Sequence, residues 1–310
     1  MNILLLDRNH PLIPEQLRAK GYRIREDYIS SYEDLLTRVF DVEGIIIRSR
    51  IPIDEKFIRH APQLKFIARV GAGLENIDTD IAKEKGIFVF NSPEGNRDTL
   101  AEHVVGMLLV LMNRLFISSQ EVKNGLWLRE ENRGEELLGK TIGIIGYGHM
   151  GKAVAKRLSG FGCEVVFHDI LPNLADSHAR EVSMEELQQT ADILSLHVPL
   201  NAGTFYMVNE NFIEGMKKAF YFINTARGKN VNTHDLVKAL QSGKIKGAAL
   251  DVLEYEKSSF ENLEGKKNED LSFLLRSEKV LLTPHIAGWS VQSKEKLARY
   301  IVDKIISRFS

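Results

Sequence analysis

Three segments of the chain place polar side chains directly after apolar runs that are typical of buried strands. INTARG puts Arg227 after one such run, and LLTPHIAG puts His285 after another. The segment ALDVLEYE ends in two acids, Glu254 and Glu256. A guanidinium offers a planar fork of donors that matches a carboxylate, and an imidazole beside a carboxylate can give and take a proton. Such a set would bind an α-keto acid and protonate its carbonyl oxygen while a hydride arrives.

A glycine-rich run upstream makes that chemistry more plausible than the ordinary explanations of each residue alone, which are a surface ion pair, a solvated loop acid and a packing histidine. TIGIIGYGHMG predicts a strand, a tight turn and a helix. Gly146, Gly148 and Gly151 fit G-x-G-x-x-G, in which the first glycine permits the turn, the second lets a pyrophosphate approach, and the third packs helix on strand. The helix N-terminus offers N–H groups to phosphates. The run predicts a dinucleotide site.

The next expected strand, residues 163–168, ends at Asp169, 18 residues after Gly151. A carboxylate there would accept hydrogen bonds from a ribose 2′-hydroxyl and would repel a 2′-phosphate. No Arg or Lys follows within ILPN. NAD is therefore favoured over NADP, the alternative being that Asp169 merely ends a strand.

Composition excludes several classes of protein. The chain has 310 residues, 44% hydrophobic and 27% charged, which suggests about two ordinary globular domains. A net charge of −1 gives no general attraction to nucleic acid or to an anionic membrane. The apolar runs 3–6 and 104–112 are too short for a signal sequence or a membrane span. The single cysteine, Cys163, fits a reducing, cytoplasmic compartment.

Apolar strands alternate with amphipathic helices on both sides of the glycine run, which predicts an α/β protein with two doubly wound parallel sheets and a cleft between two domains. Ligands bind beyond the carboxyl ends of such strands. Helices are expected at 32–40, capped by Ser31, and at 79–85, capped by Asp78. The expected strands besides 141–145 and 163–168 are 3–6, 45–48, 66–70, 87–90, 193–197, 220–224, 248–253 and 280–283.

The segment 98–115, DTLAEHVVGMLLVLMNRL, is apolar on nearly every side, so we expect a helix that is buried all round. A helix joining two domains rarely achieves that within one subunit. We therefore expect a homodimer through this helix, extended by the arm 116–136 with Trp127. The alternative is a central helix inside one domain.

Several motifs in order resemble the D-isomer-specific 2-hydroxyacid dehydrogenases over nearly the whole chain. They are RVGAGLENID, NSPEGN, AEHVVGM, ELLGKTIGIIGYGHMG, HVPL, INTARG, ALDVLEYE and LLTPHIAG. The resemblance implies a flavodoxin-like substrate domain of residues 1–96 plus 290–310 and a Rossmann NAD-binding domain of residues 97–289.

The resemblance also implies the site. Its glutamate lies five residues after the strand-end Asp251, which selects Glu256 over Glu254 as the partner that favours imidazolium at His285, while Arg227 holds the substrate carboxylate. No metal is expected. The cofactor-binding residues would be Gly146, Gly148, His149, Met150, Gly151, Asp169, His197, Val198, Pro199, Thr204, Thr225, Ala226, Asp251, His285 and Gly288, and the substrate-binding residues Arg48, Ser49, Val70, Gly71, Ala72, Gly73 and Arg227.

Within the family, IIIRSR, RVGAGLENID, NSPEGN and KNGLWLREENRGEELLGKT resemble the phosphoglycerate dehydrogenase branch most. Arg48, Arg50 and Arg69 are candidate partners of a substrate phosphate, with ordinary surface arginines as the alternative. Two other functions stay open: a glycerate/hydroxypyruvate (glyoxylate) reductase, and, from another class, a catalytically silent NAD-sensing scaffold of the corepressor type.

Two features depart from the family pattern. Lys257 replaces the proline that often follows the glutamate, and a polar loop expected to be a surface insertion runs from 257 to about 278. Trp289 stands four residues after His285, where relatives usually carry a small residue, so that it would narrow the substrate pocket or pack at the domain junction. Because the chain ends soon after its last expected helix, we expect no regulatory ligand-binding domain.

Overall fold

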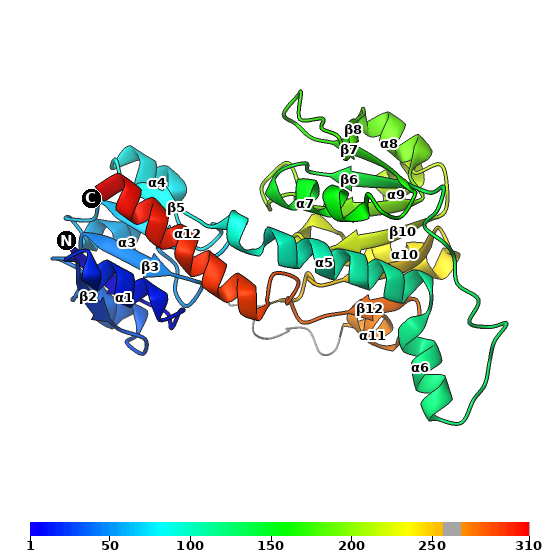
Figure 1. Ribbon diagram of the computed structural model, residues 1–310, viewed down its shortest axis with the longest axis horizontal. Helices are drawn as coiled ribbons and strands as arrows, with labels where there is room; N and C mark the ends of the chain where they lie inside the picture. Colours follow the sequence, from blue (N-terminus) through cyan, green and yellow to red (C-terminus); the bar gives the residue numbers. More distant parts are fainter. Residues whose placement is uncertain (257–267, 310) are drawn as a thin grey trace. The chain divides into compact units, whose positions relative to one another are not determined.

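The computed structural model describes residues 1–256 and 268–309 of the chain (Figure 1). The chain divides into two compact units. Unit 1 consists of Met1–Arg97 and Trp289–Ser310, and unit 2 of Asp98–Gly288. Each unit is a parallel sheet covered by helices, so each is described by itself.

Unit 1 holds a five-stranded parallel sheet in the order β2-β1-β3-β4-β5, which is the flavodoxin-like arrangement. Its strands are β1 (Asn2–Leu5), β2 (Arg23–Glu26), β3 (Gly44–Ile47), β4 (Phe66–Arg69) and β5 (Phe88–Phe90). Its helices are α1 (Leu12–Ala19), α2 (Tyr32–Leu36), α3 (Glu55–His60), α4 (Thr79–Glu84) and α12 (Val291–Phe309). The first five residues of α5 (Pro93–Met112) also belong to this unit.

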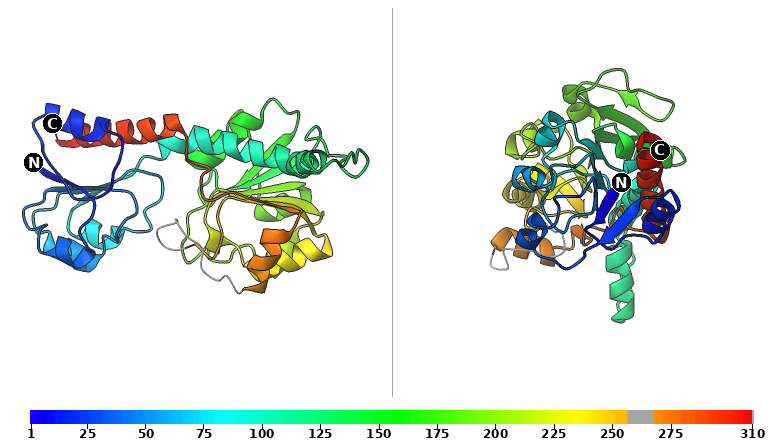
Figure 2. Two further views of the ribbon diagram at one scale, coloured as in Figure 1. Left: turned by 90° about the horizontal axis from the view of Figure 1, so that it is seen from below. Right: turned by 90° about the vertical axis from the view of Figure 1, so that its left-hand side faces the viewer.

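Alternation along the strands of unit 1 sends side chains to two separate cores. Ile3 and Leu5 of β1 face α1 and α12, whereas Leu4 and Leu6 face α2, α3 and α4. Figure 2 shows α1 and α12 along one side of this sheet. The three helices on the other side begin at side-chain caps, Ser31 with a full capping box, Asp54 and Asp78.

Unit 2 holds a seven-stranded parallel sheet in the order β12-β11-β10-β9-β6-β7-β8, a Rossmann order with one added strand. Its strands are β6 (Thr141–Ile145), β7 (Glu164–His168), β8 (Arg180–Glu181), β9 (Ile193–Leu196), β10 (Phe220–Asn224), β11 (Ile245–Leu250) and β12 (Val280–Leu282). Its helices are the rest of α5, α6 (Leu115–Lys123), α7 (His149–Leu158), α8 (Met184–Thr190), α9 (Glu210–Gly215), the 3-10 turn η1 (Gly228–Asn230), α10 (Thr233–Ser242) and α11 (Glu269–Arg276).

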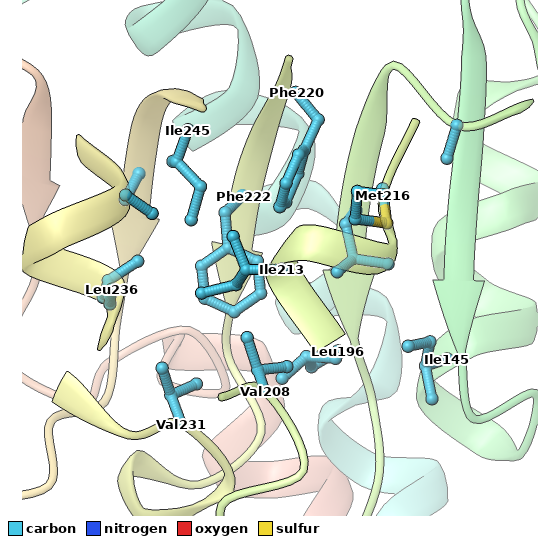
Figure 3. Close-up of a cluster of buried hydrophobic side chains, with 14 of the residues drawn as sticks. Ile145, Leu196, Val208, Ile213, Met216, Phe220, Phe222, Val231, Leu236 and Ile245 are labelled. Atoms are coloured by element: carbon cyan, nitrogen blue, oxygen red, sulfur yellow. The ribbon is translucent and has the colours of Figure 1, made fainter. Parts of the chain in front are cut away.

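Two apolar clusters hold the two faces of this sheet. One packs α5 and α7 against residues such as Ile142 and Ile193. The other lies against α8, α9 and α10, where Phe220 and Phe222 of β10 meet Ile213 and Met216 (Figure 3). The sheet is therefore covered on both sides, as buried parallel strands require.

The predicted fold class, an α/β protein with two doubly wound parallel sheets, is confirmed. Two strands, β2 and β8, were not among those predicted from the sequence. Both are edge strands rich in charge, RIRE and RE, whose side chains are mostly exposed, so neither carries the apolar signal of a buried strand.

The prediction of one helix over 98–115 that is buried all round is wrong. The helix α5 ends at Met112, Arg114 adopts a left-handed φ of 51°, and α6 continues at a 59° bend. Leu108 is buried, but Val105 is only half-buried and Gly106 is exposed. No single helix in the described parts of the chain is long and apolar enough to cross a membrane; α5 and α6 together would pass by length and composition only.

Candidate active site

The carboxyl ends of three neighbouring strands in unit 2, β10, β11 and β12, lie at one edge of the sheet. The chain leaves β10 toward Arg227, β11 toward Asp251, and β12 toward His285. Because the strands are parallel and adjacent, the topology brings the three segments to the same side of unit 2.

Glu256 and His285 form a pair at this edge. The carboxylate Oε2 of Glu256 lies 2.7 Å from Nδ1 of His285, and the side chains are 12% and 26% exposed respectively. The backbone N–H of Leu253 donates to the other carboxylate oxygen of Glu256 at 2.5 Å. The carboxylate is thus fixed from one side and oriented toward Nδ1 of the imidazole. Nε2 is the other ring nitrogen, the one that proton transfer to a substrate would use.

Glu254, the competing acid, has a different place. Its Oε2 accepts hydrogen bonds from the backbone N–H of Thr233 at 3.2 Å and from the Thr233 hydroxyl at 2.7 Å, and its Oε1 accepts one from the Tyr206 hydroxyl. Thr233 is the first residue of α10, where a carboxylate is favoured by the helix dipole. Glu254 therefore holds the start of a helix, while Glu256 faces the imidazole.

Asp251 organises the loop that carries His285. Its buried carboxylate accepts the backbone N–H groups of Ile286 and Ala287 at 2.8 Å each and the Thr283 hydroxyl at 2.5 Å, and its carbonyl accepts the N–H of His285 at 2.9 Å. His285 has a φ of 56°, a left-handed conformation that is costly for a residue with a Cβ. The Asp251 hydrogen bonds offset that cost.

Arg227 is half-buried and lies just before the 3-10 turn that starts at Gly228. The side chain of Asn224, at the end of β10, holds the turn that carries Arg227. It accepts a hydrogen bond from the Ala226 N–H at 3.0 Å and donates one to the Arg227 carbonyl at 2.9 Å. A Cβ on Gly228 would lie 2.0 Å from the Leu253 carbonyl oxygen. The Arg227 turn therefore packs directly against the loop that holds Glu256.

The glycine turn lies at the switch point of the sheet, where β6 is flanked by β7 and β9. Gly146 has a φ of 91°, and a Cβ on it would lie 2.5 Å from the His197 carbonyl oxygen. A Cβ on Gly151 would lie 2.1 Å from the Gly146 carbonyl oxygen, whereas one on Gly148 would meet no described heavy atom within 4 Å. Packing thus requires glycine at positions 146 and 151. Gly148 instead leaves open space for a ligand in front of His149 and Met150, at the start of α7.

Asp169 follows β7, next to the glycine turn. It accepts the backbone N–H of Tyr147 at 2.6 Å on one oxygen and that of Leu171 at 2.9 Å on the other. The Tyr147 ring is buried and stacks on Phe167 with ring centroids 3.8 Å apart. These contacts orient the carboxylate at the end of the second strand, where a ribose would be recognised. Tyr147 was not among the predicted site residues, although it lies inside the glycine motif.

Two buried polar atoms beside this turn have no hydrogen-bond partner among the described residues, Nδ1 of His197 and Oγ1 of Thr225. The Nε2 atom of His197 lies 2.9 Å from the Ser195 hydroxyl, and desolvation lowers the pKa of His197 to about 3, so its ring is neutral at pH 7. Buried polar groups of this kind are costly unless something pairs with them. Together with the open side of Gly148 they fit a bound dinucleotide.

Some of the other predicted cofactor-binding residues, in the loop after β9, make contacts that hold the local structure. The Thr204 hydroxyl donates to the Pro199 carbonyl at 2.6 Å and accepts the Asn201 N–H at 2.9 Å, closing the loop after β9. Val198 reaches toward Gly146, with its Cγ1 2.9 Å from the position of an added Cβ. Gly288 ends unit 2.

In unit 1 the loop of residues 70–73 follows β4 and is fixed by its neighbours. The Gly71 N–H donates to the Ser92 hydroxyl at 3.2 Å, and Asn91 donates to the Ala72 carbonyl at 2.7 Å. The arginines differ. The Arg50 guanidinium donates three hydrogen bonds, to the carbonyls of residues 6, 27 and 30, at 2.6, 3.1 and 2.7 Å. The Arg48 guanidinium instead lies over the Trp289 indole. Arg50 is therefore a structural residue.

The family model for the D-isomer-specific 2-hydroxyacid dehydrogenase NAD-binding domain matches residues 105–287, more than half of the chain. The chain belongs to this family. It is 36% identical over 303 residues to D-3-phosphoglycerate dehydrogenase 2 of Saccharomyces cerevisiae, covering 96% of this chain but only 64% of that protein. It is 34% identical over 291 residues to hydroxypyruvate reductase of Thermotoga maritima, covering 94% and 90%.

Solved structures of this family agree with the fold. A glyoxylate reductase from Paecilomyes thermophila superposes with a TM-score of 0.88 at 27% identity, covering 99% of this chain and 94% of that one. A D-lactate dehydrogenase from Aquifex aeolicus, complexed with NAD and lactic acid, superposes with a TM-score of 0.84 at 31% identity, covering 99% and 96%.

The predicted cofactor, NAD, and the predicted class, an NAD-dependent D-2-hydroxyacid dehydrogenase, are confirmed at the level of this family. The residues that would hold NAD are those of the glycine turn, Asp169 and the loop after β9. Among the described residues no group of three or more His, Cys, Asp or Glu side chains is arranged to hold a metal ion.

Two residues of the dehydrogenase site were missed by the sequence analysis. The Thr283 hydroxyl bonds to Asp251 and lies 3.2 Å from Nε2 of His103, which is itself 3.8 Å from the Asp251 carboxylate. The available signal was one histidine on the otherwise apolar face of helix 98–115. Of the polar surface loop predicted at 257–278, residues 257–267 lie outside the described residues. The prediction is wrong for the rest, because Glu269–Arg276 form the helix α11, whose Leu271 and Leu274 are buried.

Proposed function

We propose that the protein is an NAD-dependent dehydrogenase that interconverts 3-phosphoglycerate and 3-phosphohydroxypyruvate. The observation that carries the reaction type is the Glu256–His285 pair at 2.7 Å, held beside Arg227 at one sheet edge. The observation that favours a phosphorylated substrate is Arg48, a cation whose guanidinium makes no hydrogen bond or ion pair to the described residues.

The chain's own groups would divide the work. Arg227 binds the substrate carboxylate with its planar fork and polarises the adjacent carbonyl. In reduction, protonated His285 donates from Nε2 to the forming alkoxide; in oxidation, neutral His285 takes the hydroxyl proton. Glu256 orients the imidazole through the contact between its Oε2 and Nδ1 of His285. When bound, NAD would supply the acceptor for the substrate hydride, and NADH would supply the hydride donor.

For substrate binding we propose a two-part arrangement. The backbone of Val70, Gly71, Ala72 and Gly73 assists in holding the carboxylate, and Arg48 with Ser49 binds the phosphate. Residues 1–96 with 290–310 would form the substrate domain, and 97–289 the nucleotide domain.

The direct test of the substrate is a comparison of kcat/KM for phosphohydroxypyruvate and hydroxypyruvate with NADH. We expect a strong preference for the phosphorylated acid, and Arg48→Gln should remove most of it. A preference for hydroxypyruvate in the wild-type enzyme overturns this substrate.

The direct test of the chemistry is His285→Ala. We expect kcat to fall by about 100-fold or more, because proton transfer by a positioned side chain contributes at least that much. NADH binding, measured by fluorescence titration, should persist. Near-wild-type turnover would refute the assignment of His285.

A second function within the same family is reduction of hydroxypyruvate or glyoxylate. It is favoured by the Thermotoga relative and by a glyoxylate reductase of Thermofilum pendens that is 34% identical over 295 residues, and by the engagement of Arg50 with backbone carbonyls. A catalytically silent NAD-sensing scaffold is the rival from another class. Tight NADH binding with no turnover of any small 2-keto acid would support the scaffold.

We further propose a cytoplasmic homodimer serving serine biosynthesis. Large apolar side chains are exposed on α6 and the arm that follows it, which project from the body of unit 2 (Figure 2). They are Leu115, Phe116, Val122, Leu126, Trp127 and Leu128. An apolar surface of this kind is typical of a subunit interface, and the half-buried residues of α5 would add to it.

A further inference from the structure

Trp289 lies in unit 1 immediately before α12, with an indole that is 65% exposed. The guanidinium carbon of Arg48 lies 4.8 Å from the centroid of this ring. That distance is within the range of a cation–π contact, for which indole is the best aromatic partner and guanidinium the commoner cation. Trp289, which stands where the family resemblance implies a small side chain, therefore contacts Arg48, the residue proposed to bind the substrate phosphate.

The backbone of Arg48 is held by hydrogen bonds to neighbouring residues. It follows β3, its backbone N–H donates to the Asp7 carboxylate at 2.6 Å, and its carbonyl accepts from Nε of Arg69 at 3.1 Å. The rest of the side chain has four rotatable bonds, and the indole is its only recorded partner among the described residues. The position of the guanidinium thus depends on Trp289.

Stacking leaves the useful part of the guanidinium available. The indole covers one face of the planar group, and the N–H donors lie in the plane, along its edge. Arg50 shows the contrast within the same RSR segment, because its Nε and both Nη atoms donate to backbone carbonyls. Arg48 keeps an unused fork of donors that suits the oxygens of a phosphate group.

We propose that Trp289 is a positioning residue that sets substrate specificity: it holds Arg48 so that its donor edge selects 2-keto acids with a phosphate on the neighbouring carbon. The proposal rests on the function proposed above. Ordering a long side chain before the ligand arrives lowers the entropic cost of binding. The contact should therefore favour the phosphorylated substrate over its unphosphorylated counterpart.

The first experiment measures kcat/KM for phosphohydroxypyruvate and hydroxypyruvate in Trp289→Leu and Trp289→Phe. Trp289→Leu should lower the ratio of the two values by about three-fold, through KM for the phosphorylated acid, since an exposed cation–π contact is worth about that factor. Trp289→Phe keeps an aromatic face and should lose less. In an Arg48→Gln background Trp289→Leu should cause no further loss of the ratio. An equal fall for both substrates, or additive losses, overturns the proposal.

Phe40→Leu is the matched control, because Phe40 is another exposed aromatic residue of unit 1 and lies in no proposed site. It should leave the ratio unchanged. The same loss in Phe40→Leu as in Trp289→Leu would show a general effect on unit 1 and would overturn the proposal.

A second experiment needs no turnover. The chain has two tryptophans, so Trp127→Phe leaves Trp289 as the sole indole fluorophore. Titration with inorganic phosphate, with chloride at equal ionic strength as control, should change its emission saturably, and Arg48→Gln should abolish that change. An unresponsive Trp289, or an unaltered response in Arg48→Gln, overturns the contact. A wild-type enzyme that prefers hydroxypyruvate but shows this response would refute the proposed substrate and leave the Trp289–Arg48 anion site in place.

Discussion

His285 is held in a conformation that a histidine rarely adopts alone. Its φ of 56° is accompanied by four hydrogen bonds from residues 283–287 to Asp251, one of them from its own N–H. Its imidazole is set by Glu256. Strain of this kind persists only where the surroundings determine the geometry, and it is common at functional sites. The structure thus orients His285 from its backbone and from its ring.

At this scale the two acids of ALDVLEYE make a matched pair of variants. Glu256→Gln should lower kcat at least about ten-fold, because it removes the charged partner that orients the His285 ring. Glu254→Gln should leave kcat near wild type and lower Tm by about 2–4 °C, because it weakens the contacts at the start of α10. Steady-state kinetics and thermal unfolding measure the two effects. The reverse pattern would show that the two acids have been assigned the wrong way round.

The turn between β6 and α7 shows how one element combines structural and binding requirements. Gly146 and Gly151 meet backbone oxygens within 2.5 Å of where a Cβ would lie, whereas the equivalent position at Gly148 is open. The same G-x-G-x-x-G motif thus contains two glycines that packing requires and one whose open side would admit a ligand. His197 Nδ1 and Thr225 Oγ1, which have no hydrogen-bond partner in the part of the chain that the structure describes, lie just after β9 and β10.

Two alanine variants separate these requirements. Gly151→Ala should lower both Tm and NADH affinity, because its Cβ would lie 2.1 Å from the Gly146 carbonyl and would push α7 off the sheet. Gly148→Ala should keep a near-wild-type Tm but weaken NADH binding, because the methyl group occupies the approach of the pyrophosphate. Thermal unfolding and NADH titration test this pair. Tight NADH binding in Gly148→Ala would contradict the placement of the phosphates.

A charged cluster joins strands β10 and β11 to the segment before β6. Glu135 is partly desolvated, which would raise its pKa, but hydrogen bonds from Lys140, Lys246 and Tyr221 outweigh this and lower the pKa to about 2. An acid whose pKa is lower in the folded state stabilises the fold above its unfolded pKa of about 4.3. That stabilisation is lost as the pH falls toward 2.

Glu135→Gln tests the linkage. The variant should be less stable than wild type at pH 6, and the difference in Tm should shrink as the pH falls from about 5 toward 2. Thermal unfolding across that range measures it. A difference that is constant with pH would mean that Glu135 contributes by packing rather than by charge.

At the scale of the whole molecule, large apolar side chains on α6 and the arm are exposed, and no described residue of the same chain covers them. Phe116 and Trp127 are 57% and 76% exposed. Burial in a second copy would remove this surface from water, which is the main driving force of association.

Phe116→Glu should therefore weaken the proposed dimer, because it places a charge in an apolar interface. Sedimentation velocity at micromolar concentration should show a dimer for wild type and a smaller species for the variant. Ile29→Glu, at an even more exposed position in unit 1, should leave the dimer intact. A wild-type monomer at this concentration would refute the interface.

Local sequence was enough for the α/β alternation, the strand–turn–helix at residue 141, and the caps at Ser31 and Asp78, because periodicity, glycine turns and capping act between near neighbours. It missed the edge strands β2 and β8, whose pairing comes from the sheet and not from apolar side chains. The bend at Arg114 and the half-buried side of α5 also depend on what surrounds the helix.

In the candidate site, too, some features follow from local sequence and others only from the tertiary structure. Arg227, Glu256 and His285 could be named from residue types and family spacing, but the residues alone left Glu254 and Glu256 equal. Folding separates them, because α10 begins beside one carboxylate and the loop after β12 brings His285 to the other. The surroundings of Arg48 and Arg50 differ for the same reason. Two arginines two residues apart have identical chemistry, and only long-range packing gives one a set of backbone carbonyls and the other an indole.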